Sequence, residues 1–215
     1  MRGAGPHHKD ALIAATKQVL RVECTLDGID TSGRLDTDLL RLMLNNAGVK
    51  KPRISSNFRD VMEAAQHHYN VTCKADFTPH LCPGVRETLE MLTSHNIPIG
   101  LVTGNLSAIA WRKLENARIQ HHFTFGAFAE EAPTRIRLAK LAAAKARRKH
   151  FADERCDVTL IGDHANDIEA ARANEFRSVA VATGVMSADE LRALNPDVVL
   201  QNLEGATMDF IFGTQ

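Results

Sequence analysis

The chain has 215 residues, 44% of them hydrophobic, so it can bury a full core for one α/β unit with an insertion. Its 26 Lys and Arg residues equal its 26 Asp and Glu residues, and this balance argues against nucleic acid or an anionic membrane surface as a partner. No apolar run approaches the length of a membrane span, and the four cysteines lack C-x-x-C spacing, which predicts a protein of the reducing cytoplasm.

Residues 9–80 show the periodicity of amphipathic helices and contain no pattern typical of a buried strand. Pro83-Gly84 then opens a further helix, and strands alternate with helices from that point on. The predicted strands cover residues 97–102, 158–161, 178–182 and 198–200. The chain is therefore predicted to be α/β, with an all-helical unit at 9–80 and a parallel sheet with helices on both faces at 81–215.

The first polar loop of the predicted sheet is Thr103-Gly104-Asn105, directly after strand 97–102. Free N–H groups and the positive end of the next helix dipole would attract an anion such as phosphate. Gly104 lets the backbone come close to such a ligand, and Thr103 adds a hydroxyl donor. The same residues are also typical of an ordinary strand-to-helix turn with Asn105 as the cap, so the segment alone leaves both interpretations open.

Two carboxylates, Asp163 and Asp167, follow the strand 158–161. Open α/β sheets bind their ligands at this edge, and two carboxylates held close together repel unless a cation lies beside them. Oxygen ligands and a neighbouring phosphate favour Mg²⁺, whereas the ten histidines lack the spacing of a zinc site. A structural alternative is that Asn166 caps the next helix with Glu169 as its partner, which leaves Asp163 unexplained.

These two loops, LVTGN at 101–105 and IGDHAND at 161–167, resemble the second and fourth motifs of the haloacid dehalogenase-like (HAD) hydrolase superfamily. The segment 125–135 resembles the one that carries the third, basic motif, and 83–85 resembles the entry to the core after the cap. The closest branch is the phosphoglycolate phosphatase-like one, whose cap contains a segment similar to 26–36. The resemblance implies a HAD-like Rossmannoid core with an inserted helical cap.

The resemblance further implies a Mg²⁺-dependent phosphomonoesterase of a small phosphorylated metabolite that works through an aspartyl-phosphate. Its site residues would be Thr103 and the Gly104 and Asn105 amides for the phosphoryl group, Arg135 for charge balance, Asp163 for the metal, Asp167 for the metal's water shell, and Arg34 in the cap for the substrate.

Two of these assignments have simpler alternatives. Arg135 could be a surface residue at a helix start, although the helix dipole disfavours a cation there. Arg34 could form only a surface ion pair with Asp36, which would contribute little.

The family's nucleophilic aspartate, in a D-x-D-G-T loop after an apolar first strand, has no counterpart in the chain. Residues 2–5 resemble the loop after that motif, so the resemblance implies that strand, nucleophile and general acid lie upstream of Met1. The missing strand would lie between the strands ending at Val102 and Ile161, and its absence would expose two edges. We therefore expect a start codon placed too far downstream rather than a natural protein without this strand.

A second explanation is that residues 25–29 are a decayed form of this motif. Residues 18–24 would then be the strand, with Thr25 in place of the nucleophile and Asp27 as the acid/base. Arg21 and Glu23 would have to lie in a fully buried central strand, which argues against it.

Two other functions remain open. A catalytically dead module could bind a phosphorylated ligand or a protein partner through the surviving half of the site. A metal-free dehalogenase of the same fold is a third interpretation, which the Asp163 and Asp167 pair disfavours. The sequence does not indicate which phosphate ester is cleaved, or the oligomeric state.

Overall fold

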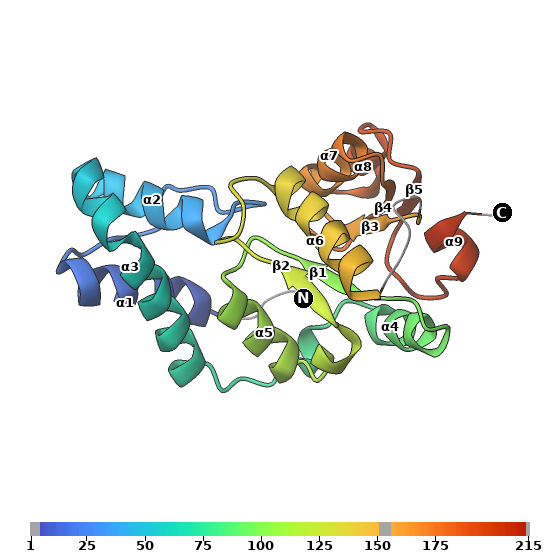
Figure 1. Cartoon of the computed structure of the whole chain (residues 1–215), viewed down its shortest axis with the longest axis horizontal. Coiled ribbons are helices and arrows are strands. Elements are labelled where there is room, and N and C mark those ends of the chain that lie inside the picture. Colours follow the sequence, from blue (N-terminus) through green and yellow to red (C-terminus); the bar gives the residue numbers. More distant parts are fainter. Residues whose placement is uncertain (1–4, 151–155, 214–215) are drawn as a thin grey trace.

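The computed structural model describes residues 5–150 and 156–213 (Figure 1). Helices come first: α1 (His7–Leu20), α2 (Asp36–Asn46), α3 (Lys51–Thr72), the 3-10 turn η1 (Thr78–His80) and α4 (Val85–Ser94). Strands and helices then alternate: β1 (Gly100–Val102), α5 (Ser107–Asn116), the 3-10 turn η2 (Gln120–His122), β2 (Phe125–Ala127), α6 (Arg135–His150), β3 (Thr159–Gly162), α7 (Ala165–Ala173), β4 (Arg177–Val181), α8 (Ala188–Arg192), β5 (Val198–Leu200) and α9 (Met208–Phe212).

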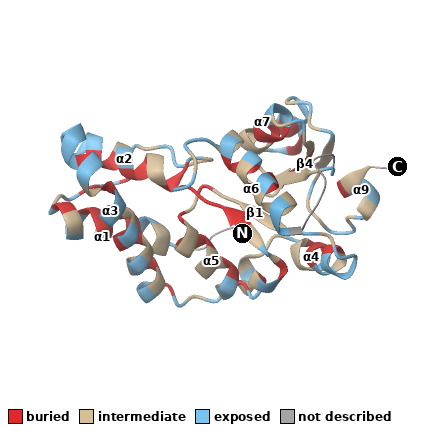
Figure 2. Cartoon of the chain, viewed as in Figure 1, coloured by how far each residue is buried: buried red, intermediate tan, exposed pale blue. Residues whose placement is uncertain are grey.

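The first three helices pack through their apolar stripes. In α3, Pro52 fits the first turn, and the buried residues Ile54, Phe58, Val61 and Tyr69 recur on one side at helical spacing. The buried sides of α1, α2 and α3 face one another in Figure 2. Each fully buried side chain of the size of Leu or Val stabilises this packing by about 2 kcal/mol.

The strands form two parallel sheets rather than one. β1 pairs with β2, and β3, β4 and β5 pair in that order. No strand of the described residues lies between β1 and β3, so each has one edge without a hydrogen-bonded neighbour. These are the two free edges that the sequence analysis expects where the first core strand is absent. The predicted fold class, α/β with parallel strands and helices, is confirmed.

Helix α6 connects the two sheets. It packs on β1 and β2 and also on α7, which in turn packs on β3 and β4. Figure 1 shows α6 between the two groups of strands. The relative placement of the sheets therefore depends on helix packing in the part of the chain described here.

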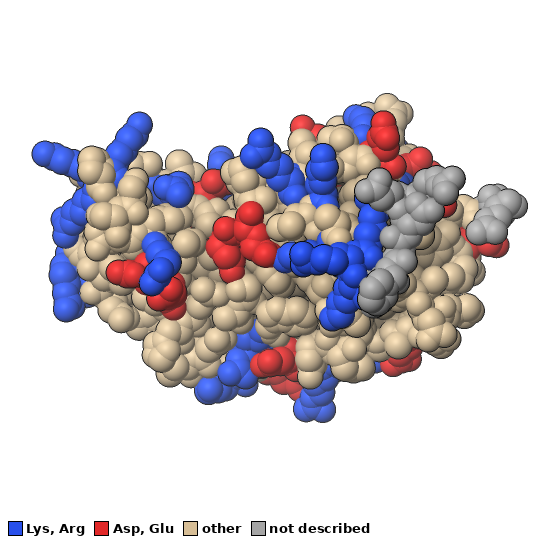
Figure 3. Space-filling model, viewed as in Figure 1, with Lys and Arg blue, Asp and Glu red and all other residues tan. Residues whose placement is uncertain are grey.

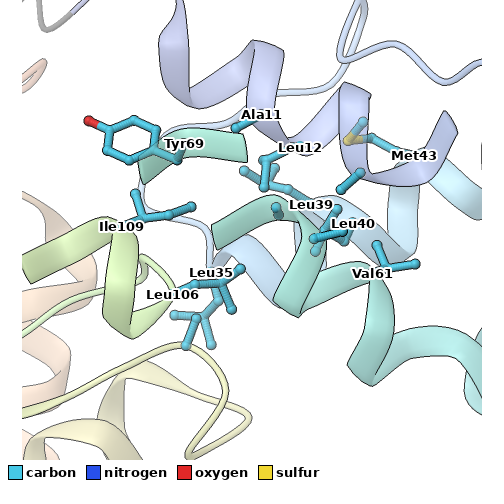
Figure 4. Packing of buried hydrophobic residues seen from close by; sticks show 14 of the residues in the cluster. Ala11, Leu12, Leu35, Leu39, Leu40, Met43, Val61, Tyr69, Leu106 and Ile109 are labelled. Carbon is cyan, nitrogen blue, oxygen red and sulfur yellow. The ribbon is translucent and has the colours of Figure 1, made fainter. Parts of the chain in front are cut away.

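The largest hydrophobic cluster runs from the helical region into the first sheet. It includes Leu12 and Leu40, Leu106 at the N-cap of α5, Ile109 of α5, and Ala127 of β2. Figure 4 shows Leu106 and Ile109 beside Leu35 and Tyr69 of the helical region. A smaller cluster lies under the second sheet. The domain boundary near residue 80 stays a prediction, and the main core crosses it.

The explanation based on a decayed motif at residues 25–29 is wrong. Residues 18–20 belong to α1, and residues 21–26 form no strand, because Arg21 ends the helix in a left-handed conformation with φ 55°. Asp27 is exposed and bonds locally to Thr25 and Lys9. A buried strand ending in a catalytic loop is therefore not formed here.

Surface charge is mixed on the face shown in Figure 3, where basic side chains gather along α6 and an acidic patch lies near the centre. None of the helices within residues 5–150 and 156–213 is long and apolar enough to cross a membrane.

The carboxylate of Asp197, just before β5, bonds to Ser178 of β4 and so connects the last two strands. Asp197 Oδ2 accepts from the N–H and the hydroxyl of Ser178, both at 2.7 Å. These bonds hold the pKa of Asp197 below its usual range, with the Ser178 backbone bond as the largest cause. We expect Asp197→Ala to lower the free energy of unfolding by about 1 kcal/mol at pH 7, because the carboxylate is largely exposed.

The sign of the pH dependence follows from this lowered pKa. The folded state binds the proton of Asp197 more weakly than the unfolded state, whose pKa is about 4. The stabilisation is therefore present above about pH 4 and is lost as the pH falls through the folded pKa. Urea unfolding of the two proteins at several pH values measures this, with the exposed Asp60→Ala as the control. A stability difference that does not shrink in acid would contradict the assignment.

Candidate active site

The loop after β1 is ordered by its own hydroxyl and by the second strand. Thr103 N–H donates to Ala127 O at 3.1 Å, extending the pairing of β1 with β2 by one residue. Thr103 Oγ1 then accepts from Asn105 N–H at 3.1 Å. The hydroxyl and the Gly104 N–H thus lie together at the carboxyl end of the strand.

The start of α5 is capped by side chains from other segments. Its N-cap residue is Leu106, which has no capping side chain, so the interpretation of Asn105 as the cap is wrong. Three N–H groups, of the N-cap residue and the first two helical residues, donate to distant acceptors: Leu106 to Asp36 Oδ2 at 2.8 Å, Ser107 to Glu130 Oε1 at 3.0 Å and Ala108 to Gln66 Oε1 at 2.8 Å. A phosphate at this loop would therefore rely on the Thr103 hydroxyl and the Gly104 N–H rather than on the helix end, because the Asn105 N–H already donates to Thr103 Oγ1.

The loop after β3 and the first turn of α7 place two carboxylates beside glycines. A Cβ on Gly162 would lie 2.4 Å from the Asp167 side chain, and one on Gly184 would lie 2.7 Å from that of Asp163. Only glycine permits these close approaches. The N-cap of α7 is His164, whose Nδ1 accepts from Asn166 N–H at 3.2 Å, so the alternative in which Asn166 caps the helix is wrong.

Arg135, the first residue of α6, links the two loops. Its Nε lies 3.5 Å from Asp167 Oδ1, and its Nη1 donates to Val102 O at 3.5 Å, one residue before Thr103. The side chains of Arg135 and Asp167 are only 16% and 14% exposed. Arg135 is therefore no simple surface residue. It connects the end of β1 to the aspartate loop across the gap between the sheets.

The electrostatics of Asp167 reflect this setting. Burial raises the pKa of Asp167, the positive charge of Arg135 lowers it, and the negative charge of Asp163 raises it. A buried carboxylate next to a second carboxylate is the arrangement that a bound cation would relieve. Among the residues that the structure describes, no group of three or more His, Cys, Asp or Glu side chains is suited to a metal.

The segment from Gly33 to Asp36 touches both loops. Asn166 Nδ2 donates to Gly33 O at 3.0 Å, and a Cβ on Gly33 would lie 2.6 Å from the His164 ring. On the other side, Asp36 N–H donates to Gly104 O at 2.7 Å. This segment of the helical region therefore covers the carboxyl ends of β1 and β3.

Arg34 lies in this covering segment with its side chain exposed. Its Nε donates to Asp30 O at 2.6 Å. The alternative of a surface ion pair with Asp36 is wrong, because Asp36 is buried and its carboxylate contacts other groups.

The structure thus brings Thr103, Arg135, Asp163 and Asp167 to one edge, with Arg34 at its rim. Sequence reasoning missed the side chains that support the first loop, which are Asp36, Gln66, Lys113 and Glu130. Nothing in their local sequence distinguishes them from surface polar residues.

Comparison with known proteins gives three kinds of similarity. A family model described as "Haloacid dehalogenase-like hydrolase" matches residues 40–181. The phosphoglycolate phosphatase of Photobacterium profundum is 32% identical over 121 residues, which are 56% of this chain and 52% of that protein. The phosphoglycolate phosphatase of Nitrosococcus oceani is 30% identical over 125 residues, 58% of this chain and 54% of that protein. The chain spans about half the length of the curated relatives it matches.

Solved structures share the fold at low sequence identity. The β-phosphoglucomutase (pgmB) of Clostridium difficile superposes with a TM-score of 0.66 and 19% identity, over 97% of this chain and 89% of that chain. A predicted phosphoglycolate phosphatase from Haemophilus somnus 129PT gives a TM-score of 0.61 and 17% identity, over 92% of this chain and 88% of that chain. At these identities the likeness concerns the fold alone.

Proposed function

Because the chain belongs to the haloacid dehalogenase-like hydrolase family, we propose that it forms the phosphate-binding and metal-binding part of a Mg²⁺-dependent phosphatase of small phosphorylated metabolites. The observation that carries this proposal is the position of Arg135. Its side chain contacts both Val102 O and Asp167, and so it connects the ends of β1 and β3 into one polar site. The names of the matched relatives make phosphoglycolate the first ester to test.

The residues present fit a hard divalent cation. Asp163, in the loop after β3, and Asp167, in the first turn of α7, offer carboxylate oxygens. Burial together with the Asp163 charge raises the pKa of Asp167, a cost that a cation would offset. Two protein carboxylates are a common set for Mg²⁺, which completes its shell with water and phosphate. When bound, Mg²⁺ would supply positive charge next to the transferring phosphoryl group.

The chain's own residues would then have distinct tasks. The Thr103 hydroxyl and the Gly104 N–H would bind the phosphoryl oxygens, and Arg135 would balance their charge from the neighbouring helix. The Asn105 N–H, which donates to Thr103 Oγ1, would orient that hydroxyl. The attacking carboxylate, which would form the aspartyl-phosphate, would come from outside these 215 residues, because they contain no D-x-D-G-T sequence. Arg34, at the rim of the edge, would contact the remainder of the substrate.

The proposal is tested with what we call the extended protein: this chain joined at its amino end to an apolar strand and a D-x-D-G-T loop. We expect it to release inorganic phosphate from 2-phosphoglycolate in the presence of Mg²⁺ and to lose this activity with chelator. The chain alone, which lacks the nucleophile, is the matched control and should be inactive. Activity that survives the chelator would favour a metal-free dehalogenase type of site and would contradict the proposal.

A second candidate is a non-catalytic module that binds a phosphorylated ligand or a protein partner. It is favoured by the observation that Arg135, Asp167 and the loop at 103–105 are held in place by contacts within this chain. An extended protein without activity, together with tight binding of inorganic phosphate by the chain alone, would support this candidate instead.

A further inference from the structure

A buried carboxylate of the helical region lies against the loop that follows β1. Asp36 is the first residue of α2 and is only 1% exposed. Its Oδ2 accepts from Leu106 N–H at 2.8 Å and lies 3.0 Å from His8 Nε2, and its Oδ1 accepts from Asn105 Nδ2 at 3.4 Å. Together with the bond from its own N–H to Gly104 O, Asp36 contacts three consecutive residues of this loop.

The side chain of Asn105 is held at both ends. Its Nδ2 donates to Asp36, and its Oδ1 accepts from Lys113 Nζ at 2.7 Å. A carboxylate can only accept and an ammonium group can only donate, so one orientation of the amide satisfies both partners and the other satisfies neither. The backbone carbonyl of Asn105 is fixed as well, by Ala129 N–H at 3.0 Å.

Lys113 and Asp36 depend on each other electrostatically. Burial lowers the pKa of Lys113, and the negative charge of Asp36 opposes this. Lys113 Nζ also lies 5.9 Å from the centre of the Tyr69 ring, a buried aromatic face. A buried cation of this kind is costly without its anion. Asn105 therefore lies between two opposite charges, of which Asp36 is fully buried and Lys113 is partly buried.

We propose that Asp36 and Lys113 are positioning residues that fix the phosphate-binding loop 103–105 by holding the amide of Asn105 in one orientation. This inference rests on the proposed function, because it concerns the same loop. Asp36 and Lys113 act through Asn105, whose N–H donates to Thr103 Oγ1. If neither orientation of the Asn105 amide satisfied both partners, relieving the unsatisfied contact would displace the backbone of Asn105, and with it the Thr103 hydroxyl and the Gly104 N–H that bind the phosphate.

The test uses the order of donors and acceptors in the hydrogen-bonded series Asp36–Asn105–Lys113. In Asp36→Asn the new amide must keep its oxygen toward Leu106 N–H, so its NH₂ group opposes Asn105 Nδ2. If Asn105 turns over, its Nδ2 opposes the Lys113 ammonium group instead. No orientation satisfies both partners, and we expect inorganic phosphate with Mg²⁺ to bind the full chain about tenfold more weakly in calorimetry.

A second substitution should restore binding. In Asp36→Asn with Lys113→Gln, the glutamine oxygen accepts from the turned Asn105 amide, and phosphate affinity should return to within about threefold of the unchanged chain. Asp36→Asn with Lys113→Met removes the same charge but offers no acceptor, so it should stay weak. Asp38→Asn, in the same helix turn, should bind phosphate normally. Equal affinity in all variants, or equal recovery with Gln and Met, would overturn the proposal.

The resonance of the Gly104 N–H in ¹⁵N NMR spectra gives a reading that does not require phosphate. It should shift in Asp36→Asn and return with Lys113→Gln, and an unchanged resonance would overturn the positioning role. If the unchanged chain binds no phosphate, the proposed function fails and the NMR result alone decides on positioning. If Asp36→Asn does not unfold cooperatively, Lys113→Met alone serves, and it must shift the Gly104 resonance for the proposal to stand.

Discussion

Asp163→Asn in the extended protein should lower Mg²⁺-stimulated phosphate release by about a thousandfold. The carboxylate lies on the polar edge next to Gly184, and the amide that replaces it is a neutral, weaker ligand for a hard cation. A bound metal contributes several kcal/mol to stabilising transition-state charge, and each 1.4 kcal/mol or so corresponds to a factor of ten in rate. Phosphate release is measured over a range of Mg²⁺ concentrations.

The matched control for this change is Asp189→Asn. Asp189 has a side chain that is 93% exposed and pairs with Arg192 in the same helix. Its replacement should leave the rate unchanged within about twofold, since surface ion pairs contribute little. If Asp163→Asn keeps the full rate and the full Mg²⁺ response, the metal assignment is wrong.

Arg135→Met should lower the free energy of unfolding of the chain by about 3 kcal/mol at neutral pH. Methionine is similar in length and apolar, so packing is largely kept, but the buried Asp167 carboxylate loses its cation. Removing one partner of a buried ion pair typically costs about 3–5 kcal/mol, a large part of a total stability of roughly 5–15 kcal/mol. Urea unfolding of both proteins in the same neutral buffer, which contains a chelator, measures the loss of unfolding free energy.

The pH dependence distinguishes this mechanism from a simple packing defect. Burial raises the pKa of Asp167 while Arg135 lowers it, so removing Arg135 raises this pKa further. A carboxyl group with a raised folded pKa favours folding below the unfolded value of about 4 and loses this contribution as the pH rises through the folded pKa. The deficit of Arg135→Met should therefore be largest at neutral pH and should shrink on acidification.

The control for Arg135 is the nearby Arg137→Met. Arg137 lies in the same first turn of α6, and it is exposed. We expect a change in unfolding free energy within about 0.5 kcal/mol for this surface substitution. A deficit for Arg135→Met that is the same in acid as at neutral pH would show that Asp167 charge is not its cause.

The loops at 103–105 and 161–167 could be predicted from sequence, because each follows an apolar strand and carries polar side chains at its carboxyl end. Arg135 is identified through the resemblance of the segment 125–135, and the structure places it between these loops. The signals that identify these positions are local: a strand pattern, a glycine and a charged side chain within a few residues.

The supporting side chains could not be predicted in this way. Asp36 and Gln66 bond to α5 from 70 and 42 residues away, and such pairings depend on how helices pack in three dimensions. Strand β2 has only three residues and is defined by its pairing with β1 rather than by a pattern of its own. The prediction of Asn105 as the cap is wrong for a similar reason, since distant acceptors replace the local one.

The gap between β1 and β3 makes the candidate site mechanically soft. Strands in one ladder are held at a fixed spacing by directional hydrogen bonds, whereas here β1 and β3 are related through the packing of α6 on α7. Side-chain packing yields to small displacements more easily than a ladder does. The separation between Thr103 and Asp163 is therefore restrained by two bridges across the gap. One is Arg135, which contacts Val102 O and Asp167, and the other is the segment 33–36, which bonds to Asn166 and to Gly104.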